Sequence, residues 1–212
     1  ILFKTEDWKF EERLSKEFEA VGFFISDHPL NQFTEIFDDY KIKDFLTFNS
    51  TEEIKDTNIA ATLLKVQERK TAKGNSYAVL KLTDLSSVFE LFIFSDVLET
   101  NREILKDGSS LILTLFKNVS NDENRLTRIN VQKIASLKDL FNSPINEVSF
   151  ELKSEQQIEK IHSILKDEGK TVVNINLVNE NNILKFRLKN SRKLDRKSLN
   201  LLRNQEIQAI IN

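Results

Sequence analysis

The sequence predicts an α+β protein in which N-terminal helices precede a five-stranded β-barrel and a small β-α-β-β-α-β domain follows it. Two observations predict this order. Apolar residues recur every three to four positions before residue 58 and at every second position after it. Beyond residue 143, strand-like and helix-like segments alternate. We therefore expect three parts, at 1–57, 58–142 and 143–212.

The first part has helical periodicity. Phe10, Leu14 and Phe18 would share one helical face, with Asp7 as the N-cap and Gly22 just beyond the end. A second helix is expected from Pro29, because proline suits the first helical turn.

Alternating segments follow, and they predict five strands at 59–68, 76–83, 88–94, 110–117 and 126–134. A short helical insert ending near Gly108 separates the third strand from the fourth. This order predicts an OB-fold, a partly open barrel that binds oligonucleotides with the face of its second and third strands.

The third part reads as strands at 148–152, 171–178, 183–188 and 207–211, with helices at 154–168 and 195–204. This is the ferredoxin-like order, which contains a split βαβ unit.

Composition excludes several classes of protein. Cysteine is absent, so thiolate metal sites and disulfides are excluded and a cytoplasmic location is expected. No apolar run approaches the ~20 residues of a membrane span. Methionine is absent even at position 1, which predicts that the chain is a piece of a longer protein.

The net charge of −2 conceals an asymmetry between the three parts. The first carries 14 acidic and 7 basic residues, the second 10 and 12, and the third 9 and 12, giving −7, +2 and +3. The acidic first part therefore hides two mildly basic parts, which are the better candidates for contact with nucleic acid.

A basic turn joins the first two predicted barrel strands. In OB-folds this loop borders the nucleic-acid groove, so its cations are expected to contact phosphates, although a solvated turn is the alternative. On the outer face of the next two strands, Tyr77 and Phe92 could stack on bases or pack on a neighbouring domain, and packing is favoured for Phe94. Glu90 on this face would weaken binding to phosphate. The candidate nucleic-acid-binding residues are Arg69, Lys70, Lys73, Asn75, Tyr77, Lys81, Phe92, Lys117, Arg125 and Arg128.

The densest basic cluster lies near the C-terminus and holds eight cations in nineteen residues. It could bind an acidic protein or DNA, or it could be an ordinary solvated surface. Its members are Lys185, Arg187, Lys189, Arg192, Lys193, Arg196, Lys197 and Arg203.

Catalytic groupings are not expected in this chain. The two histidines, His28 and His162, lack the spacing of metal ligands, and the four glycines form no phosphate-binding loop. We expect no cofactor, no metal and no chemistry of its own.

Two sets of motifs resemble the family of bacterial DNA polymerase III alpha subunits. Trp8 with Gly22-Phe23-Phe24-Ile25-Ser26 and His28-Pro29-Leu30 resembles the helical stretch that precedes the OB domain of that family. Arg69-Lys70-Thr71, Lys73-Gly74-Asn75, Leu82-Thr83-Asp84 and 90–94 resemble the OB domain itself. Asp27 stands where the family commonly has glycine. Beyond Pro144 the resemblance is one of position and topology only.

This resemblance implies a non-catalytic part of a replicative DNA-directed DNA polymerase, a nucleotidyltransferase whose catalytic aspartates would lie outside this chain. It implies single-stranded template DNA as the partner of the barrel. It also implies the tau subunit of the clamp loader, with other replisome proteins, as partners of the C-terminal domain. The alternatives are a barrel that serves only as a protein-interaction scaffold, and an anticodon-binding OB domain of a tRNA synthetase.

Overall fold

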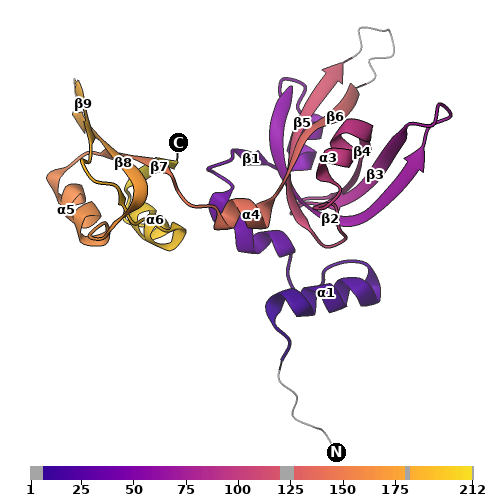
Figure 1. The fold of residues 1–212 in the computed structure, drawn as a ribbon, viewed down its shortest axis with the longest axis horizontal. Helices are drawn as coiled ribbons and strands as arrows, with labels where there is room; N and C mark the ends of the chain where they lie inside the picture. The colour runs from indigo at the N-terminus through magenta and orange to yellow at the C-terminus, as the bar shows by residue number, and fades with distance from the viewer. Residues whose placement is uncertain (1–6, 120–126, 180–181, 212) are drawn as a thin grey trace, which may run out of the picture. The chain divides into compact units, whose positions relative to one another are not determined.

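A computed structural model describes residues 7–119, 127–179 and 182–211 (Figure 1). The chain divides into two compact units, which meet in sequence between Phe141 and Asn142. In the described part, no helix is long and apolar enough to cross a membrane. The helices are α1 (Phe10–Val21), the 3₁₀ helix η1 (Pro29–Ile36), α2 (Phe45–Ser50), α3 (Ser95–Asn101), α4 (Leu137–Asn142), α5 (Glu155–Ile164) and α6 (Arg196–Arg203).

The first unit contains a curled sheet with the order β4-β3-β2-β5-β6. The five predicted strands are present, and a sixth, two-residue strand that the alternation could not reveal pairs in parallel with β2. Because β4 and β6 at the two ends of the path contact each other, the sheet closes into a partly open barrel of the OB type. The strands are β1 (Ile42–Lys43), β2 (Asp56–Lys70), β3 (Ser76–Thr83), β4 (Val88–Phe94), β5 (Ser110–Val119) and β6 (Thr127–Ser136).

Strand β2 organises the barrel because it pairs with two neighbours in succession. Its residues from Asp56 to Thr62 pair with β5, and those from Thr62 to Lys70 pair with β3. A bulge between Leu63 and Lys65 marks the change. The loop before β5 closes the bulge, since the N–H of Gly108 donates to the carbonyl of Leu63 at 2.7 Å.

The barrel core consists of alternate strand residues, which in β3 and β4 lie on the side opposite Tyr77 and Phe92. Leu80 and Leu82 of β3, Leu91 and Ile93 of β4 and Leu113 of β5 are almost completely buried. Helix α3 packs on β3, β4 and β6. Burying a leucine or isoleucine contributes about 1.5–3 kcal/mol, so this alternation drives the closure of the sheet.

The 3₁₀ helix η1 packs on the outside of the same barrel. Leu30, Phe33 and Ile36 of η1 form one apolar cluster with Ala60 of β2 and Ile112 of β5. The second predicted helix is thus present, as a 3₁₀ helix. One expectation was wrong: Lys9 rather than Asp7 occupies the N-cap of α1, without a side-chain hydrogen bond.

Helix α1 ends where glycine permits it. Gly22 has φ +79°, a left-handed conformation that side chains with a Cβ adopt rarely. The carboxylate of Glu17 then accepts hydrogen bonds from the N–H groups of Ile25 and Ser26, both at 3.0 Å. The bonds from Ser26 and Ile25 lower the pKa of Glu17, and they fold the Gly22–Ser26 motif back onto α1.

The second unit is a four-stranded sheet with helices α5 and α6, in the chain order that the sequence predicted. Its strand order is β10-β7-β8-β9. Strand β7 pairs directly and in parallel with β8, so the predicted split βαβ unit, with a strand between these two, is wrong. Every residue of β9 is exposed, which suits an edge rather than the centre of the sheet. The strands are β7 (Glu147–Leu152), β8 (Glu168–Asn179), β9 (Asn182–Arg187) and β10 (Gln208–Ile211).

His28 makes the anchoring of η1 sensitive to pH. Its Nδ1 accepts a hydrogen bond from the N–H of Leu30, and its buried Nε2 has no hydrogen-bond partner within the described residues. Burial lowers the pKa of His28 below its ordinary 6.5, against the opposing attraction of Asp84 and Asp27. Below about pH 6.5, His28 therefore binds a proton more readily in the unfolded chain than in the folded chain. The folded state loses stability as the pH falls.

We expect the urea midpoint of the chain to fall as the pH is lowered from about 7.5 to about 5.5, and part of this fall to vanish in His28→Asn. Asparagine retains an acceptor for Leu30 but does not titrate. The matched control is His162→Gln, because His162 is exposed in α5. A pH dependence that is equal in all three proteins would contradict this role of His28.

Candidate nucleic-acid interface

The predicted basic turn is an ordered hairpin at the end of β2 and β3. Arg69 lies opposite Tyr77 in the ladder. The turn is closed by hydrogen bonds from the N–H of Thr71 to the carbonyl of Asn75 at 2.8 Å, and from the N–H of Gly74 to the carbonyl of Thr71 at 2.9 Å. Gly74 has φ +84°, which only glycine adopts without strain. Arg69, Lys70, Lys73 and Asn75 are exposed.

Three rows of side chains cross the outer face of β2, β3 and β4. We call these nine residues the three-strand face. Directly opposed residues on adjacent antiparallel strands lie on the same side of a sheet, so each row is a set of neighbours. The rows are Arg69, Tyr77 and Phe94; then Gln67, Val79 and Phe92; then Lys65, Lys81 and Glu90.

Three aromatic rings lie around Val79, the central residue of this face. Phe92 is 52% exposed and Phe94 62% exposed, whereas Tyr77 is half-buried. Phe94 therefore does not plug the barrel, whereas its expected packing on a neighbouring domain stays a prediction. Val79 is buried. It lies two positions after Tyr77 on β3 and directly opposite Phe92 of β4, so the rings border one apolar strip.

Charges surround the aromatic strip. Lys81 is exposed and lies opposite both Lys65 and Glu90. With Arg69, the face carries three cations against one carboxylate. Glu90 is thus flanked by an opposite charge on the neighbouring strand, which reduces the repulsion of phosphate that the sequence suggested. Lys65 was not among the predicted nucleic-acid-binding residues, although alternation from Arg69 places it on this side of the sheet.

Lys117 does not line the groove, and this prediction needs correction. Its side chain is 5% exposed, and its Nζ donates to the carbonyls of Phe48, of Asn49 at 3.2 Å and of Thr51 at 2.9 Å. The Nζ also lies 4.5 Å from the centre of the Phe48 ring. Lys117 therefore caps the C-terminal end of α2, whose last carbonyls lack helical partners.

The other two cations predicted beside Lys117 differ in outcome. Arg128 is exposed on β6, opposite Asn118 of β5. Arg125 lies outside the described residues. Arg128 therefore does not lie on the three-strand face, which belongs to β2, β3 and β4.

Asp84, in the turn between β3 and β4, fixes the position of the strands that carry the three-strand face. The sequence did not predict this role. It is buried, and its carboxylate accepts from the N–H of Phe45 at 2.6 Å, of Ser86 at 2.8 Å and of Ser87 at 2.7 Å. The ring of Phe45 stacks on that of Phe89 at 3.8 Å. Asp84 thus ties the hairpin that carries Phe92 to the start of α2.

The C-terminal basic cluster divides into exposed and structural members. Arg203 donates to the carbonyl of Ala209 at 2.9 Å, and Arg192 forms β-bridges with residues of β8. Asp195 caps α6 by accepting from the N–H of Ser198 at 2.7 Å, and this bond lowers the pKa of Asp195. Arg196 is half-buried in α6. The exposed members are Lys185 and Arg187 on β9, Lys189 and Lys193 in the connection to α6, and Lys197 in α6.

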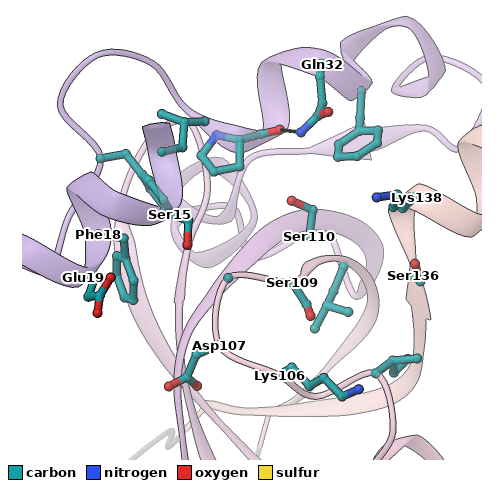
Figure 2. A pocket seen from close by; sticks show the side chains of 17 residues that line it. Ser15, Phe18, Glu19, Gln32, Lys106, Asp107, Ser109, Ser110, Ser136 and Lys138 are labelled. Carbon is teal, nitrogen blue, oxygen red and sulfur yellow. Dashed lines mark hydrogen bonds between the residues drawn. The ribbon is translucent and has the colours of Figure 1, made fainter. Parts of the chain in front are cut away.

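A separate cavity of about 800 Å³ lies beneath α1 and η1. Figure 2 shows Phe18 and Glu19 of α1 at one side of it and Ser109, Ser110 and Lys106 near the start of β5 at the other. Its lining shares no residue with the three-strand face. Within the described ranges, no group of three His, Asp or Glu side chains could hold a metal ion.

The barrel topology and its aromatic, cationic outer face define a protein of the OB-fold class. No family model matches the chain. It is 30% identical over 151 residues to DNA polymerase III subunit alpha of Rickettsia conorii, a match that covers 70% of this chain and 12% of that protein. It is 28% identical over 172 residues to the same subunit of Rickettsia bellii, covering 77% and 14%. For Escherichia coli K12 the values are 26% over 113 residues, covering 51% and 10%.

These matches confirm the resemblance predicted from the motifs: the chain is homologous to a segment of bacterial DNA polymerase III alpha subunits. It spans only about an eighth of the length of these relatives. A replication protein A heterotrimer solved with single-stranded DNA is 14% identical, with a TM-score of 0.31, covering 63% of this chain and 35% of that chain. That score is too low to relate the two folds.

Replacing Lys117 with methionine should lower the free energy of unfolding by about 2 kcal/mol, because the α2 carbonyls lose their donors in a buried place. Urea unfolding followed by circular dichroism measures the change. Lys133→Met is the matched control, since Lys133 is exposed on the neighbouring strand β6. Equal losses in the two variants would show that Lys117 has no special role.

Proposed function

We propose that this chain is a non-catalytic region of a replicative DNA polymerase in which the barrel guides single-stranded template DNA. We propose further that its C-terminal unit docks on the tau subunit of the clamp loader. Homology to DNA polymerase III alpha subunits supports the replicative setting. The observation that carries the first proposal is the three-strand face, where exposed aromatic rings adjoin a cationic hairpin.

The geometry supports a contact that does not depend on base sequence. Exposed rings at Phe92 and Phe94 offer platforms on which any base can stack, each worth about 1–3 kcal/mol. Arg69, Lys70 and Lys73 lie where a bound backbone would pass beside these rings. Glu90 and the partial burial of Tyr77 limit the strength of the contact. A weak guide suits a template that must slide.

A scaffold function, in which the barrel contacts only protein, is the second candidate. It predicts that Tyr77 and Phe92 are buried at a domain contact. The exposure of Phe92 disfavours it, while the half-burial of Tyr77 leaves it a limited basis. Binding of single-stranded DNA decides between the two.

The triple variant of Arg69, Lys70 and Lys73 to alanine should weaken binding of fluorescein-labelled oligo(dT) and flatten its dependence on salt. Each lost phosphate contact lowers the slope of log K against log [salt] by about 0.7, so a loss of about 2 is expected. Fluorescence anisotropy measures both. The control removes three exposed cations of the second unit, Lys160, Lys166 and Lys170. No binding at low salt, or equal slopes in the two variants, would refute template contact by this hairpin.

Phe92→Ala should weaken oligo(dT) binding about fivefold to a hundredfold without changing the urea midpoint, because it removes a stacking platform that is not part of the core. Val88→Ala is the matched control: Val88 is an exposed apolar residue on the same side of the same strand. If both variants bind like the parent chain, base stacking on Phe92 is ruled out.

Docking on the clamp loader is tested with the whole 212-residue chain and purified tau subunit, by surface plasmon resonance. The exposed cations of the C-terminal unit support a partly electrostatic contact, so complex formation should weaken as salt is raised. Absence of a complex at low salt would remove this half of the proposal and leave the template half untouched.

A further inference from the structure

Strand β9 forms an open edge of the second sheet. It is the last strand in the order β10-β7-β8-β9, and β8 is the one strand with which it pairs among the residues that the structure describes. All of its residues are exposed, including three large apolar side chains. Ile183 is 58% exposed, Leu184 53% and Phe186 54%.

The hydrogen-bond pattern shows which backbone groups of β9 are available. The N–H of Leu188 donates to the carbonyl of Val173 at 2.9 Å, so this opposed pair is a hydrogen-bonded one. In an antiparallel ladder hydrogen-bonded and non-hydrogen-bonded pairs alternate. Arg187, Lys185 and Ile183 therefore belong to pairs whose N–H and C=O groups point away from β8, toward the open edge.

The side chains of β9 sort into two different faces. Phe186 lies opposite Ile175 and Leu184 opposite Leu177, so both continue the apolar row that packs with the helices, yet both remain exposed. Lys185 and Arg187 lie opposite asparagines of β8 on the other side of the sheet. One face of the edge is thus apolar, and the other carries two cations beside the exposed Ile183.

We propose that an extended segment of a partner protein adds to β9 as a further strand of this sheet. Its backbone would pair with Ile183, Lys185 and Arg187. Apolar side chains on one side of the segment would lie beside Leu184 and Phe186, and acidic side chains on the other beside Lys185 and Arg187. The partner segment therefore alternates acidic and apolar residues. This inference rests on the proposed function to the extent that the second unit binds protein.

A purely protective role for the cations fits the structure less well. Lysine on an edge strand commonly prevents unwanted pairing. A protected edge, however, has no need for large apolar side chains at alternate exposed positions, and here they sit beside unpaired backbone groups. Nucleic acid also fits less well, because it would leave these strand-pairing groups and the apolar face of Leu184 and Phe186 unmatched.

The test uses the whole chain and a fluorescein-labelled peptide of about eight residues, a usual strand length, that alternates glutamate and valine. We expect saturable binding by anisotropy, and clearly weaker binding of a peptide with the same residues in two blocks. N-methylation of alternate amides should abolish binding in one of the two possible sets and spare it in the other, because only one set of N–H groups faces β9.

Two substitutions separate the backbone from the charge. Lys185→Ala removes the cation, and Lys185→Pro removes in addition an N–H that points away from β8, so the β8–β9 ladder is retained. We expect the proline variant to bind the alternating peptide about fivefold more weakly than the alanine variant, the value of one hydrogen bond. Phe186→Ser should also weaken binding, and Ile158→Ser, at an exposed position of α5, should not.

The inference is overturned if the block peptide binds as well as the alternating one, if neither set of N-methyl groups matters, or if the alanine and proline variants bind alike. Displacement of the peptide by oligo(dT) would likewise reassign β9 to nucleic acid. If tau binds the chain but ignores the β9 substitutions, this inference fails and the docking proposal stands. If the peptide pattern holds and tau does not bind, the docking proposal fails and β9 remains a strand-addition site.

Discussion

The carboxylate of Asp84 is the contact on which the first unit depends. It gathers N–H donors from its own turn and from Phe45, at the start of α2. The far end of that short helix is held by Lys117 of β5, whose ammonium group lies against the α2 carbonyls. The buried side chains of Asp84 and Lys117 therefore bind the two ends of α2. They connect this helix to the β3–β4 turn and to β5. Removing either partner would leave a buried polar group unsatisfied, which costs about 1–3 kcal/mol or more.

These contacts of Asp84 and Lys117 explain how the exposed three-strand face can keep a defined shape. Most side chains of the three-strand face are exposed, although Val79 is buried and Tyr77 half-buried. The barrel core, which Leu80, Leu91 and their neighbours fill, supports the strands of this face from the other side. The turn at Asp84 fixes how β4 pairs with β3. Aromatic rings can remain exposed there because the strands that carry them are stabilised elsewhere.

Regular periodicity made much of this architecture predictable. Alternation placed Tyr77 and Phe92 on one side of the sheet and Leu80 and Leu91 on the other, and it located all five barrel strands. The same alternation places Lys117 in the inward row of Leu113 and Leu115. The prediction of an exposed Lys117 beside the groove considered only its charge and was wrong. Its true partner could not be foreseen, because α2 is too short to show a helical period.

Long-range pairing was the other limit. The bond from the N–H of Phe45 to Asp84 joins residues 39 positions apart, and no local pattern encodes it. In the second unit the order of elements along the chain was correct, but that order is compatible with β8 or β9 as the neighbour of β7. Which of the two strands pairs with β7 depends on the rows of side chains that α5 and α6 cover. This covering is a property of the packed domain and not of any one segment.

The bulge in β2 has a mechanical consequence. Before Leu63 the strand pairs with β5 along one side and, at part of its length, with β1 or β3 along the other, whereas beyond Lys65 it pairs with β3 alone. Strand β3 in turn pairs with β4 as far as Tyr77 and Phe94, so Lys70, Ser76 and the turn between them form a two-stranded tip beyond the three-stranded part. This tip can bend or fray without opening the barrel, since its motion breaks no hydrogen bonds of β4, β5 or β6. The cations of the tip can therefore change position while the three strands beneath it stay fixed.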